Sequence, residues 1–157
     1  MSNYDKVEIA FKNLLKSIET LRELNVFTNK KDFTCQIGEW LVAILYDGER
    51  AKSGIQKHWD VEIKDKHIQV KSHAKAPTTT ARWSSITYNT EADIDELVIV
   101  VFSHDYKLKE FYKIPWKVAL PRIRQNKDRD VIYWNHLTDY RIEIDNLEKQ
   151  DLIQLFR

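Results

Sequence analysis

The sequence is poor in residues that cross-link, break or loosen a chain. Its one cysteine, Cys35, excludes a disulfide within the chain and suits a reducing compartment, so we expect a cytoplasmic protein. Three glycines and three prolines in 157 residues leave no candidate linker or repeat. No apolar run approaches the ~20 residues needed to span a bilayer, which predicts no membrane association. We therefore expect a single domain over residues 1–157.

A charge excess of one sign is also missing. The 25 Lys and Arg residues balance 24 Asp and Glu residues, so a nucleic-acid surface would have to come from local clusters. The five histidines lack the paired spacing of a zinc site, and no Gly-rich phosphate loop is present. These absences disfavour zinc chemistry and P-loop nucleotide hydrolysis.

Hydrophobic periodicity predicts two helices before the first strands. Apolar residues at three- and four-residue steps indicate an amphipathic helix over residues 4–24. A second apolar stripe follows over residues 33–45, with Asp32 as its expected cap, Gly48 at its end and Cys35 as a small buried residue. We assign residues 1–31 to an N-terminal helix and loop.

The later part of the chain favours strands. An unbroken apolar run over 97–102 is typical of a central strand covered on both faces, and residues 110–114 should pair beside it. After Pro115 we expect a short helix over 116–120, strands over 131–134 and 140–144, and a last helix capped at Asp145 or Asn146. This order predicts an α/β domain, a mixed central β-sheet flanked by helices on both sides, with a core over 32–115 and C-terminal helices and strands over 116–157.

Residues 60–71 alternate polar and apolar side chains around a polar turn, which predicts a β-hairpin. A two-residue turn at Asp65 and Lys66 would place Asp60 opposite Lys71 and Glu62 opposite Gln69. All four polar side chains would then share one face of the ribbon.

This face carries the groups that phosphodiester hydrolysis requires. Asp60 would give a carboxylate to Mg²⁺, or to Mn²⁺ in its place, while the Gln69 side chain and the Val70 backbone carbonyl would add neutral oxygens. Lys71 would orient the attacking water and offset charge on the phosphoryl oxygens. The same residues would also suit the solvated face of an ordinary hairpin.

The stretch HWDVEIKDKHIQVKS, residues 58–72, resembles the hairpin of the restriction-endonuclease-like, or PD-(D/E)xK, nuclease superfamily. The resemblance places Asp60, Gln69 and Lys71 on the acidic residue, the E or Q, and the lysine of that motif. Upstream, GEWLVAILYDG is similar to the family's preceding helix, whose glutamate often completes the metal site and corresponds to Glu39. Trp59 stands where the named motif has proline, and Gln69 replaces the more usual carboxylate.

A basic segment follows the hairpin. Residues 72–85 contain no acid, and they carry His73, Lys75, Arg82 and Trp83 among small hydroxyl side chains. Such a loop could track a nucleic-acid backbone, with Trp83 stacking on a base. It could equally be a solvated loop that returns Trp83 to the core. A second basic run is formed by Arg122, Arg124, Lys127 and Arg129.

The resemblance implies a metal-dependent endonuclease that hydrolyses phosphodiester bonds in double-stranded DNA, in restriction, defence or repair. A DNA-binding module of the same fold with weak or no activity is an alternative, for which Gln69 is the motivating feature, and a protein-interaction domain is another. A double-strand break usually needs two such centres, which a homodimer would supply. The sequence pattern alone indicates no dimer seam.

Overall fold

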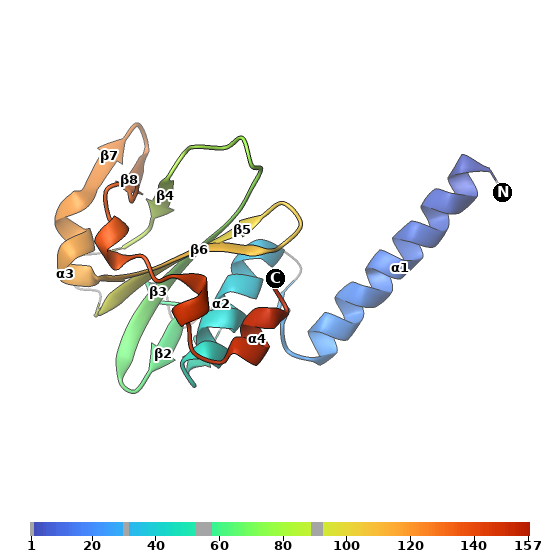
Figure 1. Ribbon diagram of the computed structural model, residues 1–157, viewed down its shortest axis with the longest axis horizontal. Helices are drawn as coiled ribbons and strands as arrows, with labels where there is room; N and C mark the ends of the chain where they lie inside the picture. The colour runs from blue at the N-terminus through green and yellow to red at the C-terminus, as the bar shows by residue number, and fades with distance from the viewer. Residues whose placement is uncertain (1, 30–31, 53–57, 89–92) are drawn as a thin grey trace.

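A five-stranded mixed sheet forms the centre of the protein (Figure 1). The computed structural model describes residues 2–29, 32–52, 58–88 and 93–157, so parts of the expected ranges 1–31 and 32–115 lie outside the described residues. The strand order is β1-β2-β3-β5-β6, with β3 and β5 parallel and the other pairs antiparallel. The expected α/β class with a mixed central sheet and flanking helices is confirmed.

The helices and strands have the following bounds. The α-helices are α1 (Asn3–Glu23), α2 (Phe33–Leu45), α3 (Trp116–Ala119) and α4 (Gln150–Gln154). The strands are β1 (Glu49–Arg50), β2 (Val61–Ile63), β3 (Lys66–Lys75), β4 (Trp83–Ile86), β5 (Glu96–Ser103), β6 (Leu108–Pro115), β7 (Ile123–Asn126) and β8 (Arg129–Tyr133). Short 3-10 helices cover Leu120–Arg122, Thr138–Tyr140 and Ile144–Asn146.

Strand β5 contributes to two hydrophobic cores, as its unbroken apolar sequence predicts. Val98 and Val100 face the core that α2 and α4 cover. Leu97 and Ile99 face a second core on the opposite side of the sheet. All four side chains have 0% exposure, so β5 is buried on both faces.

The second face is covered by a three-stranded sheet with order β4-β8-β7 together with the short α3 and neighbouring loops, rather than by helices alone as expected. Inward-facing Ile86 and Ile132 pack against the central sheet together with Trp134 and the short α3. Residues 72–85 are therefore not one loop. Strand β3 continues to Lys75, and β4 begins at Trp83.

Several expected boundaries are wrong. Residues 140–144 form no strand and only one isolated bridge, Tyr112 to Arg141. Within the described chain, Asp32 makes no side-chain cap, because its backbone is left-handed rather than extended. The last helix begins after Lys149, not after Asp145 or Asn146, and a lysine side chain has no oxygen with which to cap it. Cys35 is exposed.

The end of α2 is a Schellman motif. Asp47, with a φ of 53°, is the left-handed residue, and the Gly48 amide donates to the Ala43 carbonyl at 2.8 Å. Gly48 therefore closes the helix end as expected, although Asp47 makes the turn. The chain then enters β1 beside the hairpin.

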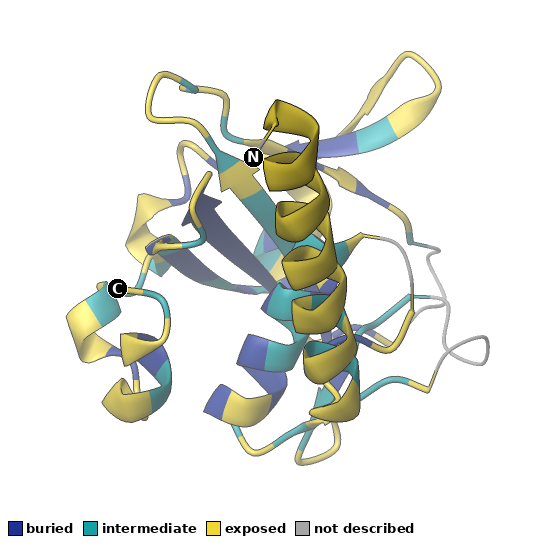
Figure 2. Ribbon diagram, turned by 90° about the vertical axis from the view of Figure 1, so that its right-hand side faces the viewer, coloured by how far each residue is buried: buried dark blue, intermediate teal, exposed yellow. Residues whose placement is uncertain are grey.

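Helix α1 forms where the periodicity predicts it but projects away from the rest of the chain (Figure 1). Ser2 and Asp5 form a capping box at its start. The structure describes every residue of α1, and none is buried (Figure 2). No helix in the described part of the chain is long and apolar enough to cross a membrane.

Candidate metal centre beside the hairpin

The β2–β3 hairpin has a different register from the expected one. Its two-residue turn is Lys64 and Asp65, with φ values of 47° and 62°, as a type I′ turn requires. Val61 therefore pairs with Ile68, and Glu62 pairs with His67 rather than Gln69. The alternation of polar and apolar residues could not exclude this register, because moving one strand by two residues leaves every side chain on the same face of the hairpin. The position of the type I′ turn therefore determines the register.

Asp60 is held rigidly at the start of β2. Its amide donates to the Ile68 carbonyl, and its carbonyl accepts from the Ala51 amide, both at 2.8 Å. Its carboxylate Oδ2 accepts from the Val70 amide at 2.7 Å. The expected pairing of Asp60 with Lys71 is thus wrong, since Asp60 reaches Ile68 and Val70. The amide and carbonyl of a strand residue point toward the same edge, which directs the Val70 carbonyl to the side where Asp60 lies.

Gln69 is a buried amide with an unpartnered oxygen. Its Nε2 donates to the His58 carbonyl at 3.2 Å and to the Thr87 carbonyl at 2.8 Å. Because carbonyls only accept, these two bonds fix the orientation of the amide group. Oε1 is buried and has no hydrogen-bond partner among the described residues. Burying an unpaired oxygen costs free energy, and a bound cation or a water molecule would give this oxygen a partner.

Glu39 lies near Asp60, in a position where its charge is disfavoured. Burial, and then repulsion from Asp60, raise the Glu39 pKa to about 7. Burial also raises the Asp60 pKa, against the hydrogen bond from Val70 and the charge of Lys71. Two partly desolvated carboxylates of like charge are the arrangement that a divalent cation relieves.

Two cations act on these carboxylates. The charge of Lys71 lowers the pKa of both Glu39 and Asp60, so α2, β2 and β3 bring the three groups into one electrostatic neighbourhood. Sequence reasoning missed Arg50, whose charge also lowers the Glu39 pKa. The Arg50 guanidinium donates to the Val26 carbonyl at 2.9 Å and to the Asn25 carbonyl, which anchors it.

A close helix-to-strand contact positions Glu39. A Cβ on Gly38 would lie 1.7 Å from Ser72 Oγ and 2.7 Å from Ser72 Cβ. Only glycine therefore allows α2 to approach β3 at this level. Glu39 follows Gly38 directly, so this contact determines how near its carboxylate comes to Lys71 and Asp60.

His73 and Arg82 are engaged inside the protein. His73 Nε2 lies 2.7 Å from Ser84 Oγ, and burial, followed by Lys75, Lys71 and Arg82, lowers the His73 pKa to about 4. Arg82 pairs with Glu110, at 2.7 Å from Nη2 to Oε1, and its Nη1 donates to the Thr79 carbonyl at 3.0 Å. At neutral pH His73 is uncharged, while Arg82 already has its ion-pair partner.

Trp83 and Lys75 are more accessible. Trp83 is 38% exposed and pairs across β4 and β8 with Tyr133, which is 49% exposed. A hollow beside Trp83 is lined by Asn126, Lys127 and Arg129 of the β7–β8 hairpin and by Val131. The structure thus brings Trp83 next to the second basic run, which the sequence could not show. Lys75 is half-buried, and burial, followed by Arg82, lowers its pKa.

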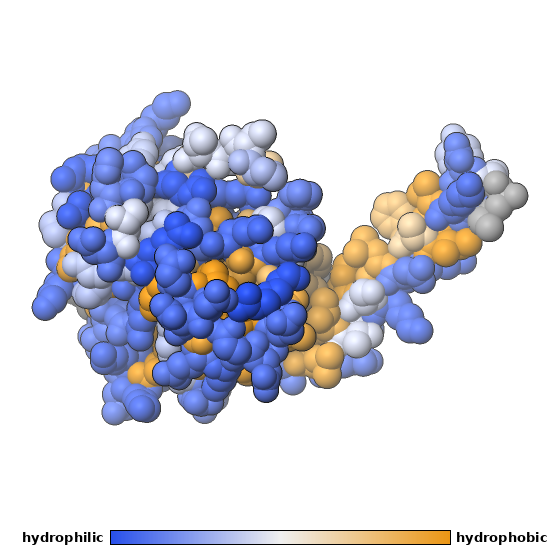
Figure 3. All heavy atoms as spheres, in the orientation of Figure 1, coloured by the Kyte–Doolittle hydropathy of each residue, from blue (hydrophilic) through white to orange (hydrophobic). Residues whose placement is uncertain are grey.

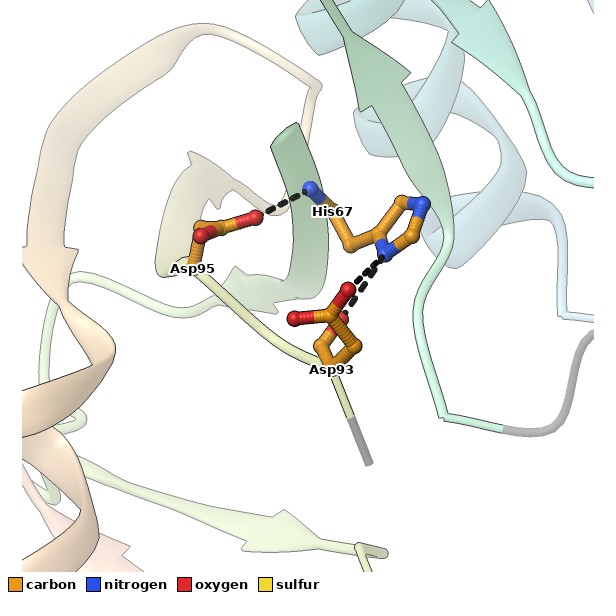
Figure 4. A group of neighbouring side chains, drawn as sticks. All are labelled: His67, Asp93 and Asp95. Atoms are coloured by element: carbon orange, nitrogen blue, oxygen red, sulfur yellow. Dashed lines mark hydrogen bonds and ion pairs between the residues drawn. The ribbon is translucent and has the colours of Figure 1, made fainter. Parts of the chain in front are cut away.

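A second group of possible ligands lies at the start of β3 (Figure 4). Ligand atoms of His67, Asp93 and Asp95 all lie within 4.8 Å of one another. However, Asp95 Oδ2 accepts from the His67 amide at 2.8 Å, and His67 Nδ1 lies 2.9 Å from the Asp93 carbonyl. These bonds tie the start of β5 to β3. Glu62 lies beside this group, with its Oε1 4.0 Å from His67 Nε2.

Comparison of the chain with models of known protein families finds no match, and comparison with curated proteins finds no relative. The chemistry of Glu39, Asp60, Gln69 and Lys71 is therefore the basis for proposing a function.

Proposed function

We propose that this protein is a metal-dependent endonuclease that hydrolyses phosphodiester bonds in double-stranded DNA. The observation that supports it best is the pair of mutually repelling, partly buried carboxylates, Glu39 and Asp60, with the Lys71 ammonium beside them. Neighbouring like charges in a desolvated place are unfavourable unless a cation offsets them. This requirement favours a binding site over a merely solvated hairpin face.

The donor set fits a hard divalent cation, Mg²⁺ or Mn²⁺. Asp60 and Glu39 would supply carboxylate oxygens, and the Val70 carbonyl and the orphaned Gln69 Oε1 neutral oxygens. Such a cation would supply Lewis-acid activation of water and neutralise phosphate charge. It would also satisfy the buried Gln69 oxygen.

Lys71 would act on the reacting groups directly. Its ammonium would hold the attacking water by hydrogen bonding and offset negative charge on the phosphoryl oxygens. The hydrogen bond from the Val70 amide would keep the Asp60 carboxylate in place through the reaction. Cleavage of the P–O3′ bond by water would leave 5′-phosphate and 3′-hydroxyl ends, which is what the resemblance to the PD-(D/E)xK nucleases implies.

The topology supports a restriction-endonuclease-like core as part of this proposal. Helix α2 precedes the β2–β3 hairpin, and β5 returns parallel to β3, so the motif lies within a mixed sheet beside the helix that carries Glu39. This order places Glu39, Gln69 and Lys71 on regular elements, with Asp60 directly before β2. Rigid elements hold catalytic groups more accurately than loops do.

The small sheet would provide the DNA contacts. Trp83 and Tyr133 form an exposed aromatic pair, and Lys127 and Arg129 lie beside Trp83 on the β7–β8 hairpin. Aromatic rings that stack on bases, next to cations that pair with phosphates, are typical of nucleic-acid surfaces. Lys75, at the end of β3, would bridge this surface and the metal centre.

Plasmid cleavage tests the proposal. With Mg²⁺ or Mn²⁺ we expect the purified protein to nick or cut supercoiled DNA, and we expect Asp60→Asn and Lys71→Ala each to lose at least ~100-fold in rate. Asp60→Asn keeps an oxygen for the Val70 amide and so should stay folded. Asp139→Ala and Lys117→Ala, matched changes at exposed positions, should retain activity. Equal cleavage by all variants would exclude this centre.

Gln69 motivates a second candidate function, a DNA-binding module with little activity. A neutral amide contributes less to cation binding than a carboxylate would, and the Gln69 Nε2 is already bound to two carbonyls. Calorimetric titration with Mn²⁺ separates the two functions. Heat of binding that Asp60→Asn abolishes supports the nuclease, whereas DNA binding in a gel-shift assay without detectable Mn²⁺ binding supports the module.

A further inference from the structure

Helix α1 presents a continuous apolar stripe to solvent. Figure 3 shows apolar side chains along this helix where it extends from the body. Phe11 is 60% exposed, Leu14 51% and Val7 50%. A helix of this length is marginally stable in water by itself, and most helices depend on packing of their apolar face. Here the described chain supplies little such packing: no residue of α1 is buried, and only Ile18, Leu21 and Arg22 are half-buried.

The spacing of the stripe is that of a coiled coil. Six apolar residues follow one another at alternating steps of three and four, which places them at the a and d positions of three heptads. The a positions are Tyr4, Phe11 and Ile18, and the d positions are Val7, Leu14 and Leu21. A strict period of 3.5 keeps the stripe in register with another helix, rather than with the surface of a sheet.

We propose that α1 pairs with α1 of a second copy of this chain to form a coiled-coil dimer. Each copy brings the same stripe, and joining two of them would bury on the order of 1,000–1,500 Å² in total, within reach of a specific interface. The flanking e and g positions do not oppose this pairing, since Glu8 and Arg22 are the charged residues there and they have opposite signs. Both flanking charges have ion-pair partners within the helix, Glu8 with Lys12 at 2.5 Å and Arg22 with Glu19 at 2.6 Å.

Sedimentation equilibrium of the full chain tests this pairing from about 1 to about 200 µM. We expect a particle of twice the chain mass. Leu14→Glu should weaken the dimer by at least ~100-fold, because it places two charges in the seam. Ile9→Glu is the matched control: Ile9 is 50% exposed, almost the same as Leu14, but lies outside the a and d positions. It should change the dissociation constant by less than about threefold.

Circular dichroism gives a second readout. Near-UV signals from the buried Trp134 should be the same in all variants, while far-UV helix content should fall when the dimer dissociates. Phe11→Glu should repeat the effect of Leu14→Glu. A monomer throughout the concentration range, or a dimer that both variants leave intact, would overturn the proposal. These measurements use neither metal nor DNA, so their outcome is independent of the proposed nuclease activity.

Discussion

At the scale of single residues, Glu39 is the most informative group in the candidate centre. Its pKa of about 7 lies above the ordinary 4.5, so the folded protein holds a proton there that the unfolded chain releases. Stability should therefore fall as the pH rises from about 4.5 to about 7 and then change no further through this group. A bound cation would reverse this dependence of stability on pH, because a cation favours the ionised carboxylate.

We predict that Glu39→Gln is more stable than the parent protein at pH 8 in the presence of EDTA. Its free energy of unfolding should be higher by about 2 kcal/mol after allowance for solvent screening. At pH 4 the two should be equally stable, because Glu39 is then protonated in both states. Urea titrations at the two pH values measure the difference.

The control is Glu49→Gln, an exposed position on the neighbouring strand β1. It should show no such pH-dependent gain. Addition of Mn²⁺ should stabilise the parent protein and not Glu39→Gln. A Glu39→Gln variant that is no more stable than the parent at pH 8 would contradict the electrostatic description of the centre.

At the scale of elements, the contact between α2 and β3 controls the centre. Gly38 leaves no space for a side chain against Ser72, and the same contact sets the distance between Glu39 and the hairpin. A methyl group at Gly38 would push α2 away from β3, and this displacement should lower both stability and metal affinity.

We predict that Gly38→Ala destabilises the protein by about 2–3 kcal/mol, because the helix must move away from the strand. It should also weaken Mn²⁺ binding, since Glu39 moves with the helix. Urea unfolding and calorimetry measure the two effects.

The double variant Gly38→Ala/Ser72→Gly provides the control, because it removes both Ser72 atoms that the new methyl group would meet. It should recover much of the Mn²⁺ affinity. If Gly38→Ala alone binds Mn²⁺ as the parent protein does, the contact has no role in positioning Glu39.

At the scale of the whole molecule, dimerisation and catalysis would be coupled. One centre cuts one strand, so a double-strand break requires two centres, and pairing through α1 would supply them. Helix α1 lies outside the central sheet, so its loss should leave each centre intact (Figure 1).

We therefore predict that Leu14→Glu still nicks supercoiled plasmid but yields at least ~10-fold less linear product than the parent protein. Ile9→Glu should yield both products normally. Agarose gels followed over time at a protein concentration that favours the parent dimer make the comparison. Unchanged linear product from a monomeric Leu14→Glu would show that cleavage of the two strands does not need the α1 dimer.

Local periodicity in the sequence was enough to predict several elements of the fold. Helices α1 and α2, the hairpin and the central strand β5 lie where their apolar spacing predicts, because burial of one or both faces imposes that spacing. The sequence also identified Asp60, Gln69 and Lys71 as the chemical groups to examine. The strand predicted over the short segment 140–144 was wrong, since a few alternating residues are compatible with turns as well as strands.

Which groups meet in space depends on the folded chain and could not be predicted from this periodicity. The type I′ turn at Lys64 and Asp65 set the hairpin register, and a glycine contact between α2 and β3 brought Glu39 near Asp60. Hydrogen bonds from distant segments fixed the Gln69 amide, and the fold left most of the apolar stripe of α1 exposed. The hairpin register, the α2–β3 contact and the Gln69 bonds depend on residues far apart in the chain or on backbone angles, which the spacing of side-chain types does not encode.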